Sequence, residues 1–490
     1  MRNHGFISRE RNVIVLFGLF GIAIGLLTPI AVELATSGKN LWLALAPVIL
    51  PVILLVAVRP VLGAVAVIGF GFVNPSSLSP LIEVGPLTLR YVDGVFGLLI
   101  CMVLASLAMQ RRIEISREFW QLVAPLLLFL LYIGISLVTV LISAPNFIGA
   151  SIASYLRLAL TALFAPILYL TLRDRWDAHF YHSGLKFFAM ATIAVGAYLA
   201  WASLEHGETA RRSGGIIGIG PLGLISGLAI LYAFIKRDEK RRSTEWIFSL
   251  ALGLLGLYVA KTAVSIFAAA VTVTVYLGFM RSRRFDLLRW AVVGIIMTTA
   301  AALAVWNFRP ADVSGFANLS GGSFAERLMI GYAGFQIFLS NPVTGVGWQA
   351  STAEAVVGSP ALIATVSERF PQLTSHYFSA TAPATVHNMY IQFLAELGII
   401  GFALFAWVCF RTGRRVARIL RNIAAESPYR VWAQFYVLGL LFLLIWWNHN
   451  PLFGGQIETM LALTFLTLLA NVAQLERQRV EQLPVINRKI

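Results

Sequence analysis

Charged residues are scarce in this chain of 490 residues: they make up 12% of it, whereas a soluble protein carries about a quarter. Hydrophobic residues make up 58%, and the mean hydropathy is +0.78. Apolar runs long enough to cross a bilayer recur from one end of the chain to the other. The scarcity of charge therefore excludes a soluble globular protein. It predicts an all-α polytopic membrane protein with about 12–14 transmembrane helices.

Cysteine is nearly absent. The two that occur, Cys101 and Cys409, both lie in predicted spans, so neither a disulfide nor a cysteine metal site is expected. The N-terminal residues also lack the small-residue cleavage pattern of a signal peptide. We therefore interpret the apolar run that begins at Asn12 as a first span.

Several signatures of well-known catalytic sites are missing too. The sequence contains no P-loop, no dinucleotide-binding glycine fingerprint and no nucleophile elbow. On the predicted outer side it has no aspartate pair that could hold a metal and a nucleotide sugar. It also has no histidine pair with the spacing of a helical zinc site. No metal or other cofactor is expected, and a nucleotide-sugar donor is disfavoured.

The charge that is present is basic: the formal net charge is +15 and the pI is about 10.1. Such a balance could indicate nucleic acid as a partner. The basic clusters, however, fall in alternate loops between predicted spans, among them "KRDEKRR", "RSRR" and "RTGRRVARILR". This is the positive-inside rule, so the basicity sets the topology and argues against nucleic acid. It predicts that both termini are cytoplasmic.

The apolar runs predict roughly fourteen spans. They lie near residues 12–33, 41–58, 60–74, 93–109, 120–142, 151–171, 184–203, 216–235, 245–260, 262–280, 288–306, 388–410, 431–448 and 454–473. We expect five regions: N-terminal transmembrane helices (1–150), central transmembrane helices (151–306), one large outer loop (307–387), C-terminal transmembrane helices (388–473) and a cytoplasmic tail (474–490).

The outer loop is far longer than an ordinary connection. It contains "SFAERLMIGYAGFQIFLSNP", in which Ser323 and Glu326 have the spacing of a capping box. Large apolar residues then recur at helical spacing until the Asn-Pro pair stops the run. We expect an amphipathic helix that lies on the membrane surface or packs over the bundle. A turn at Gly345 and Gly347 should follow it.

Arginines are rare on the predicted outer side, so each is a candidate for binding an anion. Arg211 and Arg212 precede "SGGIIGIGPLG", whose backbone amides could approach a phosphate closely; the alternative is a span boundary anchored at the headgroups. Arg327 lies in the first turn of the loop helix, where a cation opposes the helix dipole, which favours a phosphate partner. Arg157 lies inside a span and must either pair or reach the interface.

The stretch "TVHNMYIQFLAELGIIG" begins a predicted span with polar residues. His387 stands at its threshold beside Asn388, with Tyr390 one turn further, and a neutral imidazole there can take a proton from a hydroxyl near pH 7. The alternative for a single histidine is a hydrogen bond to a backbone carbonyl. Glu396 is predicted about two turns inside the hydrocarbon, where an acid needs a partner, and this favours a supporting role. "NHNPLF" around His449 is a lower-ranked candidate that we interpret as a turn.

The order of these features resembles a known family. A basic residue before a glycine-rich span entry, then "ERLMIGYAGFQIFLSNPVTGVGW", then "HNMYIQFLAELGIIG" resemble the bacterial O-antigen ligase and O-antigen polymerase family of membrane glycosyltransferases, over roughly residues 150–450. The resemblance implies transfer of a glycan from undecaprenyl diphosphate to an acceptor sugar hydroxyl. The acceptor would belong to the lipid A core or to a polysaccharide repeat, and the reaction would take place at the periplasmic face of the bacterial inner membrane.

The resemblance also implies roles for single residues. His387 matches the proposed general base of the family, and Arg212 and Arg327 match arginines that would hold the diphosphate. Arg211 remains an alternative to Arg212. Lys261, in "AKTAVS", could supply a charge where the family often has Ser-Arg, so its role is open.

Together these residues predict an inverting, metal-independent transfer. Fixed arginines would stabilise the departing diphosphate, and His387 would deprotonate the acceptor. Asn388 and Tyr390 could bind sugar hydroxyls or orient the imidazole. The alternative is a polysaccharide flippase or another transporter of lipid-linked oligosaccharide. A transporter should carry charges along a path near the midplane, whereas here they cluster at the outer face and in one loop.

Overall fold

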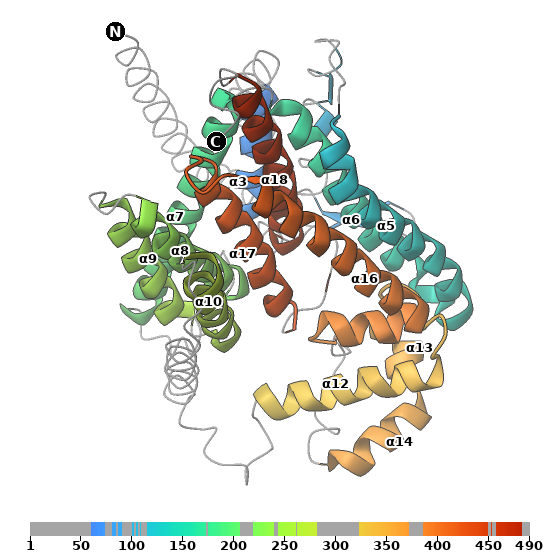
Figure 1. Cartoon of the computed structure of the whole chain (residues 1–490). Helices are drawn as coiled ribbons and strands as arrows, with labels where there is room; N and C mark the ends of the chain where they lie inside the picture. The colour runs from blue at the N-terminus through green and yellow to red at the C-terminus, as the bar shows by residue number, and fades with distance from the viewer. Residues whose placement is uncertain are drawn as a thin grey trace, which may run out of the picture.

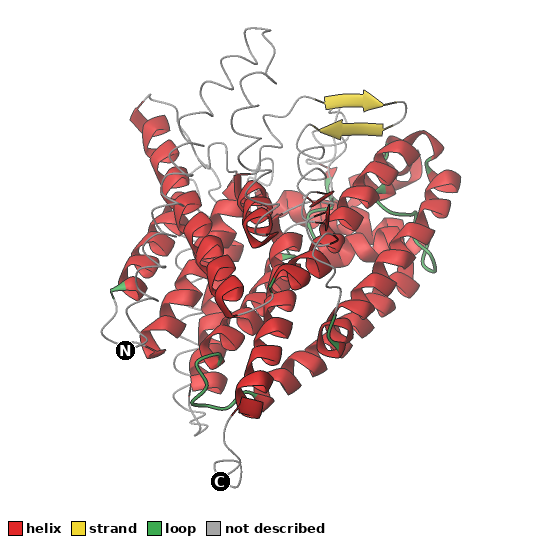
Figure 2. Ribbon diagram, turned by 90° about the horizontal axis from the view of Figure 1, so that it is seen from above, coloured by secondary structure: helices red, strands yellow, loops and turns green. Residues whose placement is uncertain are grey.

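The computed structural model is almost entirely helical in the residues that it describes (Figures 1 and 2). These are residues 60–73, 81–84, 87–90, 115–172, 175–205, 219–239, 244–260, 262–281, 323–371, 386–448 and 457–482, with single positions at 100, 101, 104, 105, 108 and 452. The predicted all-α class is confirmed. One small addition is a two-stranded antiparallel hairpin of β1 (Leu81–Val84) and β2 (Leu87–Arg90), in which Glu83 pairs with Thr88.

The helices follow the predicted apolar runs. They are α3 (Pro60–Val73), α5 (Arg117–Ser143), α6 (Ile148–Thr171), α7 (Arg175–Glu205), α8 (Ile219–Glu239), α9 (Glu245–Ala260), α10 (Ala263–Val275), α12 (Ser323–Ser340), α13 (Glu354–Val357), α14 (Pro360–Arg369), α16 (Met389–Asn422), α17 (Arg430–Trp446) and α18 (Ile457–Gln482). Shorter turns are η2 (Pro145–Phe147), η4 (Tyr276–Arg281, a π-helix) and η6 (Ala350–Thr352).

Five helices in the described part are long and apolar enough to cross a membrane. They cover Arg117–Ser143, Pro145–Thr171, Gly220–Asp238, Met389–Asn422 and Ile457–Glu481. Three further apolar helices are shorter: Glu245–Ala260, Ala263–Gly278 and Arg430–Trp446. The predicted spans 12–33, 41–58 and 288–306, and most of 93–109, lie outside the described residues, so the total of 12–14 stays a prediction. A polytopic membrane protein is confirmed.

Burial distinguishes the centre of the bundle from its rim. In the apolar stretches of α8 and α18, 78% and 89% of the residues are buried, whereas in that of α5 only 22% are buried. On α5 the exposed side chains are large and apolar, including Leu131, Val138 and Ile142, the last 81% exposed. Water would strongly disfavour such a stripe, so this face of α5 is a lipid-facing surface.

Small residues let the central helices approach closely. Gly253 and Gly256 of α9 face Ser226 of α8: a Cβ added at Gly253 would lie 2.9 Å from the Ser226 carbonyl oxygen, and one at Gly256 would lie 2.1 Å from its Oγ. Without a hydrophobic force between helices in lipid, such close contact is the main source of attraction. The pair α8 and α9 therefore packs closely at these two glycines.

This packing makes a prediction for Gly253→Ala. The added methyl group would overpack the α8–α9 contact, and we expect a loss of about 1–3 kcal/mol of stability. Thermal unfolding of the purified protein in detergent measures it as a lower midpoint. Leu254→Ala is the matched control because Leu254 is 54% exposed on the same helix. Equal midpoints for both variants would contradict the packing.

Candidate active site

Helix α16 is broken at Gly398. This glycine has φ 65° and ψ −167°, a backbone conformation that side-chain-bearing residues essentially never adopt. The break separates residues 389–397, which are mostly buried in protein, from residues 399–422, which carry exposed Ile400 and Phe410. The second part therefore has the lipid-facing surface of a span, and the first part belongs to the protein interior.

The loop 341–347, "NPVTGVG", docks into this break. Where the first part of α16 ends, its last carbonyls have no partners within the helix. The amide of Val346 donates to the Ala395 carbonyl at 3.0 Å, and the amide of Gly347 donates to the Glu396 carbonyl at 2.8 Å. Both carbonyls are thus paired by the loop.

The other side of the break is paired by the same loop. The second part of α16 begins with amides that also lack helical partners. Ile399 donates its amide to the Pro342 carbonyl at 2.9 Å, and Ile400 donates to the Val343 carbonyl at 3.4 Å. An unpaired backbone group inside a membrane protein costs several kcal/mol, so the loop and the break stabilise each other.

Three glycines make this docking possible. A Cβ at Gly345 (φ 68°) would lie 2.3 Å from the Glu396 carbonyl carbon, and a Cβ at Gly398 would lie 2.3 Å from the Val343 carbonyl oxygen. Gly347 (φ 94°) lies against α5, where a Cβ would stand 2.8 Å from a carbonyl oxygen. The predicted turn at Gly345 and Gly347 is confirmed, and its glycines are required by contact with other helices.

Glu396 is enclosed by protein at the end of the first part of α16, with no exposed surface. Its carboxylate accepts hydrogen bonds from the Ser351 hydroxyl at 2.5 Å and from the Gln392 side-chain amide at 3.1 Å. The partner that a buried acid requires is therefore supplied by a hydroxyl and an amide. The hydrogen bond between Glu396 and Ser351 connects η6 to α16.

Asn388 begins α16 as its N-cap. Its side-chain oxygen accepts hydrogen bonds from the amides of Tyr390 (2.9 Å) and Ile391 (3.2 Å), and its Nδ2 donates to Oδ1 of Asn448 at 2.8 Å. Both ends of the amide are thus engaged within the protein. Asparagine is a preferred N-cap because its side-chain oxygen accepts hydrogen bonds from the first amides of the helix.

The start of α16 is tied to the end of α17. The amide of Met389 donates to the Trp447 carbonyl at 3.0 Å, and the Tyr390 hydroxyl donates to the Leu444 carbonyl at 2.5 Å. The Tyr390 hydroxyl therefore connects α16 to α17. The sequence analysis had suggested the same hydroxyl for binding a sugar or for orienting the imidazole.

A further set of amide side chains was missed by the sequence analysis. Leu452 donates its amide to Gln392 Oε1 at 2.7 Å, and its carbonyl accepts from Gln392 Nε2 at 3.2 Å and from Gln349 Nε2 at 3.1 Å. These contacts, with that of Asn448, place the two described residues of "NHNPLF", Asn448 and Leu452, against α16, whereas the lower-ranked candidate His449 lies outside the described residues. The polar residues of "NHNPLF" could have indicated these contacts, but the sequence analysis interpreted that segment only as a turn around His449.

His387 lies between a buried neighbour and the helix cap. Val386 is 4% exposed and Asn388 is fixed as the N-cap, whereas the His387 side chain is exposed. The backbone on both sides of the imidazole is thus held, while the side chain itself is exposed.

Arg327 is on a helix that packs against the same segment. In α12, Gly331 and Gly334 approach α16: a Cβ at Gly334 would lie 2.8 Å from Ile391 and 3.1 Å from Val386, the residue before His387. Arg327 precedes these glycines by four and seven residues, which puts it on the same helix face. Figure 1 shows α12 beside the first part of α16. The structure thus brings the elements of Arg327 and His387 together.

Arg157 belongs to a third element at this site. It is half-buried on α6, three residues after Ser154, whose hydroxyl accepts a hydrogen bond at 3.3 Å from the indole of the fully buried Trp348. Trp348 follows the docked loop and shares a core cluster with Phe393 of α16. Arg157 therefore lies one turn from the loop contact.

Other predicted site residues lie outside the described part of the chain. They are Arg211, Arg212 and Lys261, and the side chains of Ser323 and Glu326 in the predicted capping box. Their roles stay predictions. The predicted loop helix itself is confirmed as α12. Within the described residues, no three His, Cys, Asp or Glu side chains gather as a metal site.

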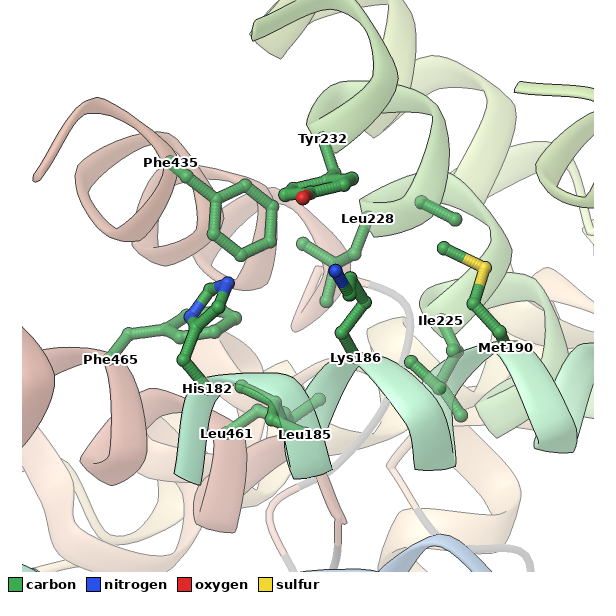
Figure 3. Close-up of a pocket in the computed structure, with 12 residues that line it drawn as sticks. His182, Leu185, Lys186, Met190, Ile225, Leu228, Tyr232, Phe435, Leu461 and Phe465 are labelled. Carbon is green, nitrogen blue, oxygen red and sulfur yellow. The ribbon is translucent and has the colours of Figure 1, made fainter. Parts of the chain in front are cut away.

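A small apolar cavity lies elsewhere, between α7, α8, α17 and α18 (Figure 3). Its volume is about 50 Å³, and its polar lining includes His182, Lys186 and Tyr232. Lys186 forms an ion pair with Glu245 at 2.6 Å, and the Tyr232 hydroxyl donates to the same carboxylate at 2.7 Å. None of the candidate site residues lines this cavity, so it does not enter the active-site hypothesis.

Comparison with known proteins gives a match to one segment of the chain. Residues 247–406 match the family model described as O-antigen ligase. This segment of the chain is similar to the O-antigen ligase family. The match covers about a third of the chain and includes α12, the docked loop, His387 and the break in α16.

Two curated relatives are distant. Both are named "Putative polysaccharide ligase": one from Rickettsia conorii is 23% identical over 230 residues, and one from Rickettsia felis is 23% identical over 232 residues. The aligned part is 47% of this chain and 52% or 53% of the relative. The chain thus spans about half the length of the curated relatives that it matches. The predicted resemblance to the O-antigen ligase family is confirmed.

The break in α16 predicts a large effect of Gly398→Ala. The left-handed conformation costs a side-chain-bearing residue about 1–3 kcal/mol, and the Val343 carbonyl must also move away. We expect a lower unfolding midpoint and faster hydrogen exchange of the Val346 and Gly347 amides, which lose their carbonyl partners when the loop undocks. Gly413→Ala is the matched control on the same helix, because nothing lies within 4 Å of an added Cβ there. There a gain of up to about 1 kcal/mol is expected. Similar behaviour of the two variants would rule out the docking.

Proposed function

We propose that this protein is a membrane glycosyltransferase of the ligase or polymerase type. It transfers a glycan from undecaprenyl diphosphate to a sugar hydroxyl of the acceptor, at the periplasmic face of the bacterial inner membrane. The observation that carries the proposal is the exposed His387, held between a buried residue and a helix cap inside the matched O-antigen ligase segment. The half-buried Arg327 on the packed face of α12 supports it.

In this proposal the donor needs charge stabilisation more than it needs an acid. Diphosphate is already a good leaving group, and its negative charge increases as the glycosidic bond breaks. A guanidinium fixed at a site of low dielectric constant stabilises that charge without reorganisation. Arg327 would bind the diphosphate, with Arg212, or its neighbour Arg211, and Lys261 as further ligands. Arg157, one turn from the loop contact, would support the same anion.

The acceptor hydroxyl needs a base. The neutral imidazole of His387 would take its proton as the oxygen attacks the anomeric carbon, and the bond between that carbon and the diphosphate oxygen would break. Undecaprenyl diphosphate leaves, and the configuration at the anomeric carbon inverts. Arginines stabilise the leaving group and His387 accepts the proton, so we propose that the transfer is metal-independent.

The acceptor distinguishes two versions of the same chemistry. A ligase joins the glycan to the lipid A core, whereas a polymerase joins one polysaccharide repeat to another, in O-antigen or in exopolysaccharide. The alternative from another class is a flippase of lipid-linked oligosaccharide. Arg327 in the loop and His387 at the start of α16, rather than a row of charges near the midplane, favour the enzyme over the transporter.

His387→Ala is expected to reduce transfer by about 10²–10⁴-fold, because it removes the general base. The glycan profile of a deletion strain complemented with each variant measures the effect. Loss of the surface ladder with accumulation of long lipid-linked chains indicates a ligase. Single repeats on the core, or loss of secreted polymer, indicate a polymerase.

The control for this experiment is His179→Ala, because His179 is an exposed histidine on α7, away from the site. It should restore the wild-type profile, and addition of EDTA to a membrane assay should leave transfer unchanged. Full restoration by His387→Ala would mean that His387 is not the base.

Arg327→Ala is expected to lower kcat by about 10²–10³-fold, the cost of removing one donor to a developing anion. A steady-state assay with purified protein and varied donor concentration measures it. Arg369→Ala is the matched control, because Arg369 is an exposed arginine in the same loop, on α14. Equal losses in both variants would show that Arg327 acts only through the general charge of the loop.

A further inference from the structure

Helix α12 exposes a row of large apolar side chains. Leu328 is 52% exposed, Phe335 is 43% exposed and Leu339 is 52% exposed, and Val343 just beyond the helix is 56% exposed. The spacings of seven and four residues put Leu328, Phe335 and Leu339 on one side of the helix. The opposite side, with Ile330, Ala333 and Ile337, packs into the protein core. We refer to these four exposed residues as the outer face of α12.

The neighbouring helix of the same loop has a different surface. The exposed residues of α14 include Ala361, Ala364, Thr365 and Glu368, which are small or polar. Such a surface is suited to water, whereas the outer face of α12 is not. The apolar exposure is therefore a property of α12 and not of the whole loop.

The contacts of α16 fix the position of one end of this face. The carbonyl of Val343 accepts a hydrogen bond from the amide of Ile400, and the preceding residue pairs with Ile399. Ile399 and Ile400 are 49% and 46% exposed on a membrane-spanning helix, so they face lipid. Val343 therefore lies beside lipid-facing residues, and Leu339 is one helical turn away from it.

Contacts with α5 give the same depth independently. The Ser143 hydroxyl donates to the Val346 carbonyl at 2.5 Å, and a Cβ at Gly347 would lie 2.5 Å from the side chain of Val140. In that part of α5, Leu141 is 54% exposed and Ile142 is 81% exposed. Only acyl chains would make this exposure favourable, so the loop after α12 lies at the edge of the hydrocarbon layer.

We propose that the outer face of α12 lies in the bilayer, at the boundary between headgroups and acyl chains. Its occupant is the hydrocarbon of the surrounding phospholipids. The surface is continuous with the lipid-facing surfaces of α5 and α16 through Val343, and a helix with an apolar side of this kind lies in the plane of the interface. The proposal depends on the spans of α5 and α16 and not on the chemistry proposed for His387.

One consequence rests on the proposed function. Arg327 precedes Leu328 directly, so a helix inserted through Leu328 and Phe335 holds this arginine at the level of the lipid headgroups. A diphosphate attached to a lipid occupies that same level. The outer face of α12 would therefore set the depth at which the donor is bound.

Fluorescence quenching in proteoliposomes tests the inserted face. Single cysteines are introduced by Phe335→Cys and Leu339→Cys in a chain with Cys101→Ser and Cys409→Ala, and each is labelled with a bimane maleimide. The quenchers are a phospholipid with a nitroxide near the headgroup and aqueous iodide. Ile142→Cys serves as the lipid-facing control and Thr365→Cys as the water-facing control. Because the labelled positions are exposed, the substitutions should leave the fold intact.

We expect labels at 335 and 339 to be quenched by the nitroxide lipid about twofold more than the label at 365, and to be protected from iodide. Quenching by iodide at the level of position 365 would overturn the proposal. Protection from both quenchers, relieved when the protein-to-lipid ratio is lowered, would also overturn it and would indicate a second copy of the chain as the occupant. Wild-type transfer activity has no bearing on either outcome.

Discussion

The pairing between the "NPVTGVG" loop and the broken helix α16 is the interaction on which the site depends. A break at Gly398 leaves carbonyls on one side and amides on the other without helical partners, in surroundings that water does not reach. The loop supplies two amides and two carbonyls to them. Gly345 and Gly347 have no side chain that would prevent the approach. The glycines of this motif are therefore needed for the fold, whereas the proposed chemistry belongs to residues on either side of it.

Several consequences follow from that pairing. The loop begins where α12 ends, so docking fixes α12 against the start of α16, and with it the face that carries Arg327. Glu396 and Gln392 extend the connection to η6 and to the α17–α18 segment. Asn388 then caps a helix that is in contact with α12, η6 and the segment between α17 and α18. The backbone that carries the exposed His387 is therefore held in place, and the proposed general base requires a fixed position of this kind.

The sequence predicted where most of the described helices lie, but it did not predict the break within α16. Hydropathy predicted the spans now described, and the capping pattern with the Asn-Pro stop predicted α12. The break in α16 was missed because "ELGIIG" continues the apolar periodicity, and a glycine within a span is ordinary. Glu396 consequently appeared to lie in hydrocarbon, whereas it is enclosed by protein, and one of its hydrogen-bond partners, Ser351, is 45 positions away in the sequence. Asn448 could not be predicted, because it pairs across sixty positions.

Formation of a new glycosidic bond by the purified protein is the most direct test of the proposed activity. The protein in detergent is incubated with a defined undecaprenyl diphosphate oligosaccharide and an acceptor, and the product linkage is determined by NMR. Detergent removes the compartments that a transporter needs. The account predicts release of undecaprenyl diphosphate and a product with inverted anomeric configuration. If no bond forms, while the same protein moves lipid-linked glycan across vesicles, the chain is a transporter and the account is wrong.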